Sequence, residues 1–261
     1  MIGIFDSGLG GLTVARAIMD ELPGYNLTYF GDTARTPYGA KSAATVIKYA
    51  LEDTQFLISR GAQMIVMACN SASSMAMESV TRTFSVPVFE VITPAVELAA
   101  SLSPHGRIGV IGTRATINSG IYEKKIREKR PDARVYAVPC PLLVPLVEEG
   151  WINKPETTMI IKKYLHPLKM RKIDTLILGC THYPILKPII EKKIGKQTII
   201  IDSSTAIARA VKARLVEHPD AGEKFSRNGE TYFYVSDMTK QFKKTAGMIL
   251  KKSISLELAD T

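Results

Sequence analysis

Short apolar runs alternate with longer amphipathic stretches along most of the chain. The runs are rich in β-branched and aliphatic residues, a pattern typical of parallel sheets that helices cover on both faces. It predicts strands at Ile2–Phe5, Leu27–Phe30, Met64–Met67, Val86–Val91, Arg107–Ile111, Val135–Val138, Thr175–Leu178, Thr198–Ile201 and Tyr232–Val235. It predicts helices at Leu12–Glu21, Ala43–Arg60, Ser71–Thr83, Pro94–Ser101, Ala115–Arg130, Lys154–Leu165, Ile185–Lys193, Ser204–Glu217 and Met238–Leu250. We therefore expect an α/β protein.

The length of the chain, 261 residues, favours two domains, because domains usually have roughly 100 to 150 residues. We expect a first hinge at Ile92–Pro94, since proline is tolerated in a first helical turn but not in the middle of a helix. A second hinge is expected at Asp202–Ser204, where a strand ends at helix-capping residues. The expected domains are 1–93 plus 205–261 and 94–204, two similar parallel-sheet domains with the active site in the cleft between them.

Two of the predicted strands end in a cysteine that polar residues follow at once. One is the run Met64–Ser71 with Cys69, and the other is the run Leu176–His182 with Cys180. A continuous apolar run of strand length indicates a buried parallel strand, and ligands bind at the carboxyl ends of such strands. The two runs are too far apart for one local metal site, but they suit equivalent strands of two similar domains. Both thiols would then face one cleft.

The composition favours a globular protein without a membrane span. Hydrophobic residues make up 46% of the chain and charged residues 23%, and no apolar stretch approaches the ~18 residues that cross a bilayer. The start, Met1–Asp6, lacks the basic and apolar parts of a secretory signal, which predicts a cytoplasmic protein. The odd total of three cysteines favours free thiols. Cys140, between two prolines, is expected to pack as a small apolar residue.

The formal net charge of +9 raises the question of an anionic partner such as nucleic acid. The basic residues occur in small groups at helical spacing, for example Lys124, Lys125 and Arg127. This distribution favours the solvated outer faces of amphipathic helices over a nucleic-acid patch. A small anionic substrate would still gain from the long-range field.

Two polar loops follow predicted strands of the first domain. In Asp6–Gly11 the glycines let backbone N–H groups approach an anion at the start of a helix. The spacing does not match the dinucleotide-binding pattern, because position 13 is Thr. Asp6 would tune a nearby thiol and Ser7 would bind substrate, or both would cap the helix. The second loop, Gly31–Gly39, contains a rigid turn with Pro and Gly and is either a site loop or an ordinary surface loop.

His182 lies two residues after Cys180 and gives this cysteine a chemical context. An imidazolium beside a thiol lowers a cysteine pKa from ~8.5 into the range of about 3.5 to 7.5. The same pair, joined by Asp6 and Cys69, would suit zinc, but no further Cys or His pair supports a metal site, and none is expected. A cysteine nucleophile paired with histidine is another possibility, although it leaves the second strand-end cysteine without a role.

Four segments in matching order resemble the cofactor-independent glutamate racemases. The resemblance covers almost the whole chain and rests on Gly3–Val14, Gly31–Gly39, Ala68–Ser73 and Leu178–Pro184. The wider aspartate/glutamate racemase superfamily shares the two cysteines. The Asp-Ser-Gly start and the Pro37–Gly39 loop resemble the glutamate branch.

The resemblance implies a racemase that needs neither pyridoxal phosphate nor a metal. Cys69 and Cys180 would be the acid/base pair, with Cys69 deprotonating D-glutamate and Cys180 deprotonating L-glutamate. Asp6 would assist Cys69, and His182 would assist Cys180, oriented by Glu148 or by the adjacent Glu149. The residues around the substrate would be Asp6, Ser7, Pro37, Tyr38, Gly39, Asn70, Ser71, Thr113, Thr116, Thr181 and His182.

One position departs from the family, because residue 71 is Ser where the family commonly has Thr. The hydroxyl is kept and a packing methyl is lost. The resemblance also implies a homodimer and a supply of D-glutamate for peptidoglycan synthesis. Three alternatives stay open at this point: an aspartate racemase of the same superfamily, a basic nucleic-acid-binding protein and a thiol hydrolase.

Overall fold

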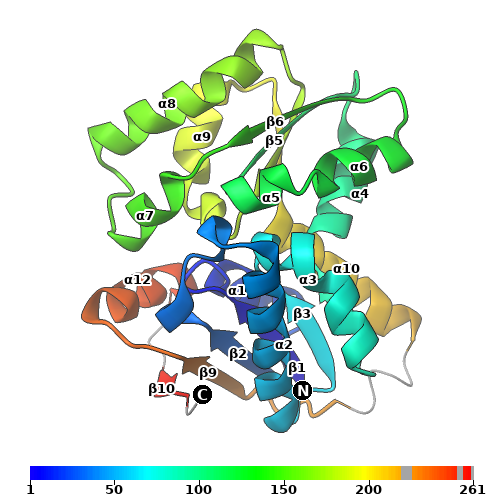
Figure 1. Ribbon diagram of the computed structural model, residues 1–261, viewed down its shortest axis with the longest axis vertical. Helices are drawn as coiled ribbons and strands as arrows, with labels where there is room; N and C mark the ends of the chain where they lie inside the picture. The colour runs from blue at the N-terminus through cyan, green and yellow to red at the C-terminus, as the bar shows by residue number, and fades with distance from the viewer. Residues whose placement is uncertain (219–224, 252–254, 260–261) are drawn as a thin grey trace.

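The protein is an α/β protein with two parallel sheets, as expected (Figure 1). The structure is a computed structural model that describes residues 1–218, 225–251 and 255–259. The larger sheet contains β1 (Ile2–Asp6), β2 (Leu27–Gly31), β3 (Met64–Met67), β4 (Val88–Glu90), β9 (Thr231–Val235) and β10 (Glu257–Leu258). The smaller sheet contains β5 (Arg107–Gly112), β6 (Arg134–Pro139), β7 (Thr175–Gly179) and β8 (Ile199–Asp202).

The strand order is β10-β9-β2-β1-β3-β4 in the larger sheet and β6-β5-β7-β8 in the smaller sheet. The smaller sheet therefore matches the last four strands of the larger one. In the larger sheet β2 pairs with one edge of β1 and β3 with its other edge, and in the smaller sheet β6 and β7 flank β5 in the same way. Strands β3 and β7 are therefore equivalent. Ligands bind at such reversal points, which lie between β1 and β3 and between β5 and β7. The two strand-end cysteines follow β3 and β7.

Helices surround the sheets, with 3₁₀ turns at the strand ends. The helices are α1 (Leu12–Glu21), α2 (Ala43–Ser59), α3 (Asn70–Thr83), α4 (Ile92–Leu102), α5 (Arg114–Asn118), α6 (Ile121–Lys129), α7 (Leu143–Glu148), α8 (Pro155–Met170), α9 (Lys187–Ile194), α10 (Ser203–Glu217) and α12 (Lys240–Leu250). The 3₁₀ turns are η1 (Thr33–Arg35), η2 (Tyr38–Ala40) and η3 (Tyr183–Leu186). Among the described residues, no helix is both long and apolar enough to span a membrane.

The central strands are buried on both faces. In β1, Ile2 and Ile4 belong to the core cluster that α1 also joins, whereas Phe5 packs in the cluster on the opposite face with α2. Successive side chains of a strand point to opposite faces, so a run without polar residues needs cover on both sides. This explains why continuous apolar runs predicted the strands well.

The prediction of one helix at Ala115–Arg130 was wrong. The chain forms α5 and α6 there, separated at Gly120, which has a φ of 69°. Glycine adopts this left-handed conformation without a steric penalty and ends helices for that reason. The short helix α7, which contains Pro145, and the two-residue strand β10 were not predicted. The helix expected from Pro94 begins earlier, at Ile92, and carries Pro94 in its first turn.

The chain passes between the two sheets twice, once from β4 into α4 and once from β8 into α10. The two connections are neighbours, because α4 contacts α10 and β8, and α10 contacts β4. The second sheet and its helices lie together on one side of the first sheet in Figure 1. The domain boundaries, 1–93 plus 205–261 and 94–204, stay a prediction.

Candidate active site

The two cysteines Cys69 and Cys180 lie at equivalent strand ends. Cys69 caps the N-terminus of α3, and Cys180 directly follows β7. Each is 5% exposed, and both are free thiols. Each therefore sits at the reversal point of its own sheet. The first N–H groups of α3 have no partners within the helix and place a partial positive charge beside Cys69.

The surroundings of Cys69 favour its protonated thiol over the thiolate. Burial, and then the charge of Asp6, raise the pKa of Cys69 to about 12. The Ala72 backbone N–H and the Ser7 hydroxyl, 3.6 Å from Sγ, act in the opposite direction. The charge of Cys180 also acts on Cys69, so the two thiols share one electrostatic environment.

Cys180 belongs to a chain of three polar side chains. Its Sγ lies 3.8 Å from His182 Nδ1, and His182 Nε2 lies 3.1 Å from Glu148 Oε1 at the end of α7. Burial alone lowers the pKa of His182, but the hydrogen bonds and charges of Cys180 and Glu148 raise it to about 10. An imidazolium ion therefore stands beside Cys180 at neutral pH. Glu148, rather than Glu149, contacts His182.

Asp6 joins the two sheets. Its Oδ2 accepts the N–H groups of Gly8 and Gly11 at 3.0 Å each, and its Oδ1 accepts the Thr181 hydroxyl at 3.2 Å. Burial raises the pKa of Asp6, although the charge of His182 and these hydrogen bonds act in the opposite direction. Asp6 therefore holds the glycine turn and affects Cys69 through its charge.

Three buried hydroxyl groups meet between α3 and α5. Ser71 Oγ lies 2.9 Å from Thr113 Oγ1 and 3.3 Å from Thr116 Oγ1, and the two threonine oxygens are 3.1 Å apart. The hydroxyl of residue 71 thus keeps its partners although the family's methyl group is missing. Thr113 also caps α5 through the N–H of Thr116.

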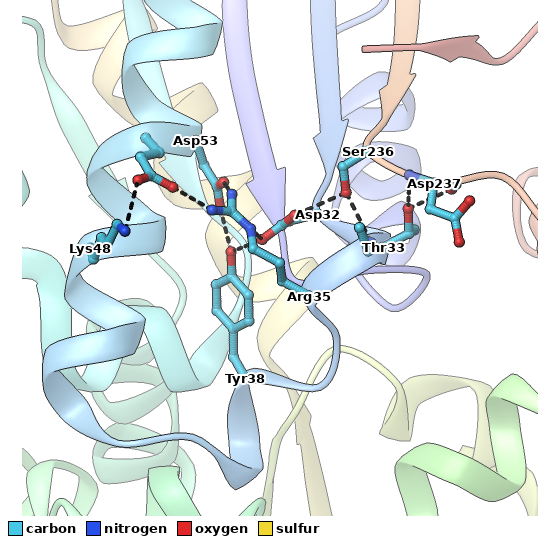
Figure 2. Close-up of polar contacts among 10 residues, drawn as sticks. Asp32, Thr33, Arg35, Tyr38, Lys48, Asp53, Ser236 and Asp237 are labelled. Carbon is cyan, nitrogen blue, oxygen red and sulfur yellow. Dashed lines mark hydrogen bonds and ion pairs between the residues drawn. The ribbon is translucent and has the colours of Figure 1, made fainter. Parts of the chain in front are cut away.

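Figure 2 shows the Tyr38 side chain directed at Asp32, Arg35 and Asp53. Its hydroxyl lies within hydrogen-bond distance of Asp32 and of Asp53, which is 2.8 Å away, and both carboxyl groups are fully buried. Arg35 bonds to the same two groups at 2.6 and 3.1 Å. These contacts anchor the loop, and Gly39 lies directly against Thr113 of the other domain.

The site is closed in this structure. Of the residues expected around the substrate, Asp6, Ser7, Tyr38, Asn70, Ser71, Thr113, Thr116, Thr181 and His182 are buried, and Pro37 and Gly39 are half-buried. A cavity of about 200 Å³ lies beside Glu148, lined also by Gly8 and Thr36 and by residues of α12. Both thiols are therefore largely covered in this structure. No group of three or more His, Cys, Asp or Glu side chains that suits a metal ion occurs in the described part of the chain.

Several contributors to the site carry no local sequence signal. The Thr13 hydroxyl in α1 lies 2.8 Å from the Gly10 carbonyl and 3.1 Å from the Thr181 carbonyl, and Tyr122 in α6 donates to Asn70 Oδ1 at 2.7 Å. The contacts with Thr181 and Asn70 join residues around the larger sheet to residues around the smaller sheet. The only sign of these residues in the sequence is their place in amphipathic helices, which does not distinguish them from core residues.

Gly10 lies tightly against Thr181 and His182, and Gly10→Ala should disrupt this contact. A Cβ at Gly10 would lie 2.3 Å from Thr181 Oγ1 and 2.4 Å from His182 Nδ1. We expect a loss of about 1–3 kcal/mol in the free energy of unfolding and a fall in turnover of about 10²-fold, because misplacing reacting groups by about 1 Å has that effect. Denaturant titration and steady-state kinetics measure both.

Gly247→Ala in α12 is the matched control, because a Cβ there meets nothing within 4 Å. The same substitution in an open helical position should stabilise the protein by about 0.5–1 kcal/mol and leave turnover unchanged. Equal behaviour of the two variants would contradict the close approach at Gly10.

Known proteins match this chain over nearly its whole length. Residues 14–211 match the family model described as Asp/Glu/Hydantoin racemase. The glutamate racemase of Persephonella marina is 48% identical over 98% of this chain and 95% of its own length. The structure of glutamate racemase isoform RacE1 from Bacillus anthracis is 35% identical, with a TM-score of 0.93 over 100% of this chain and 97% of that one. The structure of glutamate racemase from Francisella tularensis in complex with D-glutamate is 39% identical, with a TM-score of 0.91 over 99% and 97%.

Proposed function

The chain belongs to the Asp/Glu/Hydantoin racemase family and, within it, to the glutamate racemases, and from this premise we propose that it interconverts L- and D-glutamate with two cysteines as acid and base. The observation that supports the mechanism is the pair of buried thiols Cys69 and Cys180, which follow equivalent strands of the two sheets. A racemase needs such a pair, because a proton must leave one face of the α-carbon and another must arrive on the opposite face.

The reaction needs one thiolate and one thiol. The thiolate takes the α-proton, and the electron pair of the broken C–H bond moves into the α-carboxylate, which becomes an enolate. The opposite thiol then gives its proton to the other face of the α-carbon. Thiol and thiolate have exchanged, so the same site works in the reverse direction. Cys180 is assigned to L-glutamate and Cys69 to D-glutamate on the family resemblance.

The neighbours of each sulfur suit this exchange. Negative charge on Cys180 is balanced by the His182 cation, which Glu148 holds in place. Negative charge on Cys69 is balanced by the N-terminus of α3, including the Ala72 N–H. Developing charge on the substrate carboxylate is stabilised best by preorganised donors in a site without water.

Donors for the substrate are available around both thiols. Asn70 Nδ2 is buried and has no hydrogen-bond partner in the described part of the chain. The hydroxyl groups of Ser71, Thr113 and Thr116 pair only among themselves and with backbone, so they can turn toward a bound carboxylate. Glutamate carries two carboxylates, and these two groups of donors suit one each.

Incubation with L-glutamate in heavy water, without added cofactor, tests the reaction. We expect D-glutamate to form and to carry deuterium at its α-carbon, because the arriving proton comes from a thiol that exchanges with solvent. Chiral chromatography and mass spectrometry measure both. D-Glutamate that retains the original hydrogen throughout, or no D-glutamate at all, would contradict the two-base mechanism.

Parallel incubations separate this proposal from its rivals. L-Aspartate should turn over much more slowly than L-glutamate, whereas an aspartate racemase would show the reverse order. A thiol hydrolase would form an acyl adduct on Cys69 or Cys180, visible in the intact mass of the protein, and we expect none.

Supply of D-glutamate for peptidoglycan synthesis is the role we assign to this reaction, on the basis of the family. A homodimer and a cytoplasmic location stay predictions of the sequence. A role in binding nucleic acid stays disfavoured by the dispersed basic residues.

A further inference from the structure

Tyr122 contacts the strand ends that carry both cysteines. Its hydroxyl donates to Oδ1 of Asn70, the residue after Cys69. Its ring lies against Gly179, the residue before Cys180, because a Cβ at Gly179 would lie 3.1 Å from ring carbon Cε2. The side chain is 2% exposed. One tyrosine of α6 therefore connects the two halves of the site.

Only the oxygen of the Asn70 amide has a hydrogen-bond partner among the described residues. Tyr122 occupies Oδ1, while Nδ2 is buried and has no partner among the described residues. A buried donor without a partner costs about 1–3 kcal/mol and is rare in folded proteins. Next to Cys69, such a donor fits an oxygen of a bound ligand.

The Tyr122 hydroxyl determines which atom of the amide is left free. Burial raises the pKa of Tyr122 well above its usual range, so the hydroxyl keeps its proton and acts as a donor. In the described part of the chain it donates to Asn70 alone. The amide oxygen must therefore face Tyr122, and the NH₂ group is left for the ligand. A flipped amide would present its oxygen to a carboxylate, and the two would repel.

We propose that Tyr122 is a positioning residue that holds the Asn70 amide with Nδ2 directed at a substrate carboxylate. This inference rests on the proposed function, because it takes glutamate as the ligand of that amide. Tyr122 acts across the domain boundary, so the amide is oriented only when the domains are closed. Binding of the carboxylate and closure of the site thereby support one another.

Tyr122→Phe isolates the hydroxyl, because the ring that packs on Gly179 is kept. We expect KM for glutamate to rise about tenfold in both directions, the loss of roughly one hydrogen bond, with kcat changed less than about twofold. In Asn70→Ala the donor is gone, so adding Tyr122→Phe should cause no further loss in kcat/KM. Circular dichroism at a range of glutamate concentrations measures all four proteins.

Tyr183→Phe is the matched control, because it also removes a buried hydroxyl, one that donates to the Cys140 carbonyl at 2.9 Å. It should lower the melting temperature about as much as Tyr122→Phe and leave KM unchanged, alone and with Asn70→Ala. An unchanged KM in Tyr122→Phe, or losses that multiply in the double variant, would overturn the positioning role. Absence of turnover in the unaltered protein would instead refute the proposed function itself.

Discussion

Cys69→Ala and Cys180→Ala should each abolish racemisation while leaving the fold intact. Either change removes the only proton carrier on one face of the substrate, so inversion stops in both directions. We expect turnover to fall by about 10⁴-fold, the upper end of what one acid/base group contributes. The polarimetric or circular-dichroism signal of L-glutamate and of D-glutamate should stay constant over time.

Cys140→Ala provides the control for both variants. Cys140 is also a buried free thiol, but it lies at the end of β6, and its Sγ faces the Val138 carbonyl at 3.5 Å. All three variants should lose about 0.5–3 kcal/mol in the free energy of unfolding, and only Cys140→Ala should keep full activity. Full activity in Cys69→Ala or Cys180→Ala would reject the two-base assignment.

His182→Asn should lower kcat/KM by about 10- to 100-fold. The amide nitrogen of asparagine can replace Nδ1 as a neighbour of Cys180, but it cannot carry the positive charge that balances the thiolate. A hydrogen bond to a charged group contributes about 1.5–3 kcal/mol, and each 1.36 kcal/mol corresponds to tenfold in rate. The loss in kcat/KM must be equal in both directions, because the two enantiomers have the same free energy in water.

Primary isotope effects show whether His182 assists proton removal from L-glutamate or from D-glutamate. If Cys180 takes the proton from L-glutamate, the variant should show a larger primary isotope effect with α-deuterated L-glutamate and little change with α-deuterated D-glutamate. The opposite pattern would reverse the assignment of the two cysteines. His166→Asn, at an exposed position of α8, is the control and should match the unaltered protein.

His182→Asn should also change the pH dependence of the free energy of unfolding. The pKa of His182 is raised to about 10 in the folded state, so folding takes up a proton between the ordinary value of ~6.5 and about 10. The contribution of His182 to stability is therefore complete below about pH 6.5 and is lost as the pH rises through about 10. The difference in unfolding free energy between the unaltered protein and His182→Asn should shrink over that range.

The strands and the place of the two thiols were predictable because buried parallel strands leave a clear signal. A run such as Met64–Met67 has no polar position, so its end at Cys69 is sharp, and the carboxyl end of a parallel strand has a known direction. The same reasoning applies to Cys180. The helix break at Gly120 was missed because the amphipathic pattern continues through it, and a single glycine is tolerated inside a helix.

Contacts between the domains were beyond prediction from the sequence alone. Tyr122 has the pattern of a core residue of α6, and its bond to Asn70 depends on how the two sheets are placed relative to one another. The direction of the Tyr38 side chain depends likewise on its contacts with Asp32 and Asp53. Nothing in the sequence marks these two carboxyl groups as partners of Tyr38. Residue types in a loop indicate that a turn forms, but not which side of it faces a ligand.

The paired connections between the sheets predict how the site opens. A rigid domain held by two neighbouring connections, at the starts of α4 and α10, swings most easily about the line that joins them. Contacts near that axis barely move, whereas those on the far side separate most. In Figure 1, α7 and α12 lie opposite α4 and α10, and they contact one another beside the cavity at Glu148. A swing of this kind would withdraw Glu148, His182 and Cys180 together from the glycine turn, so the enzyme would open its site and move its two thiols apart in one movement.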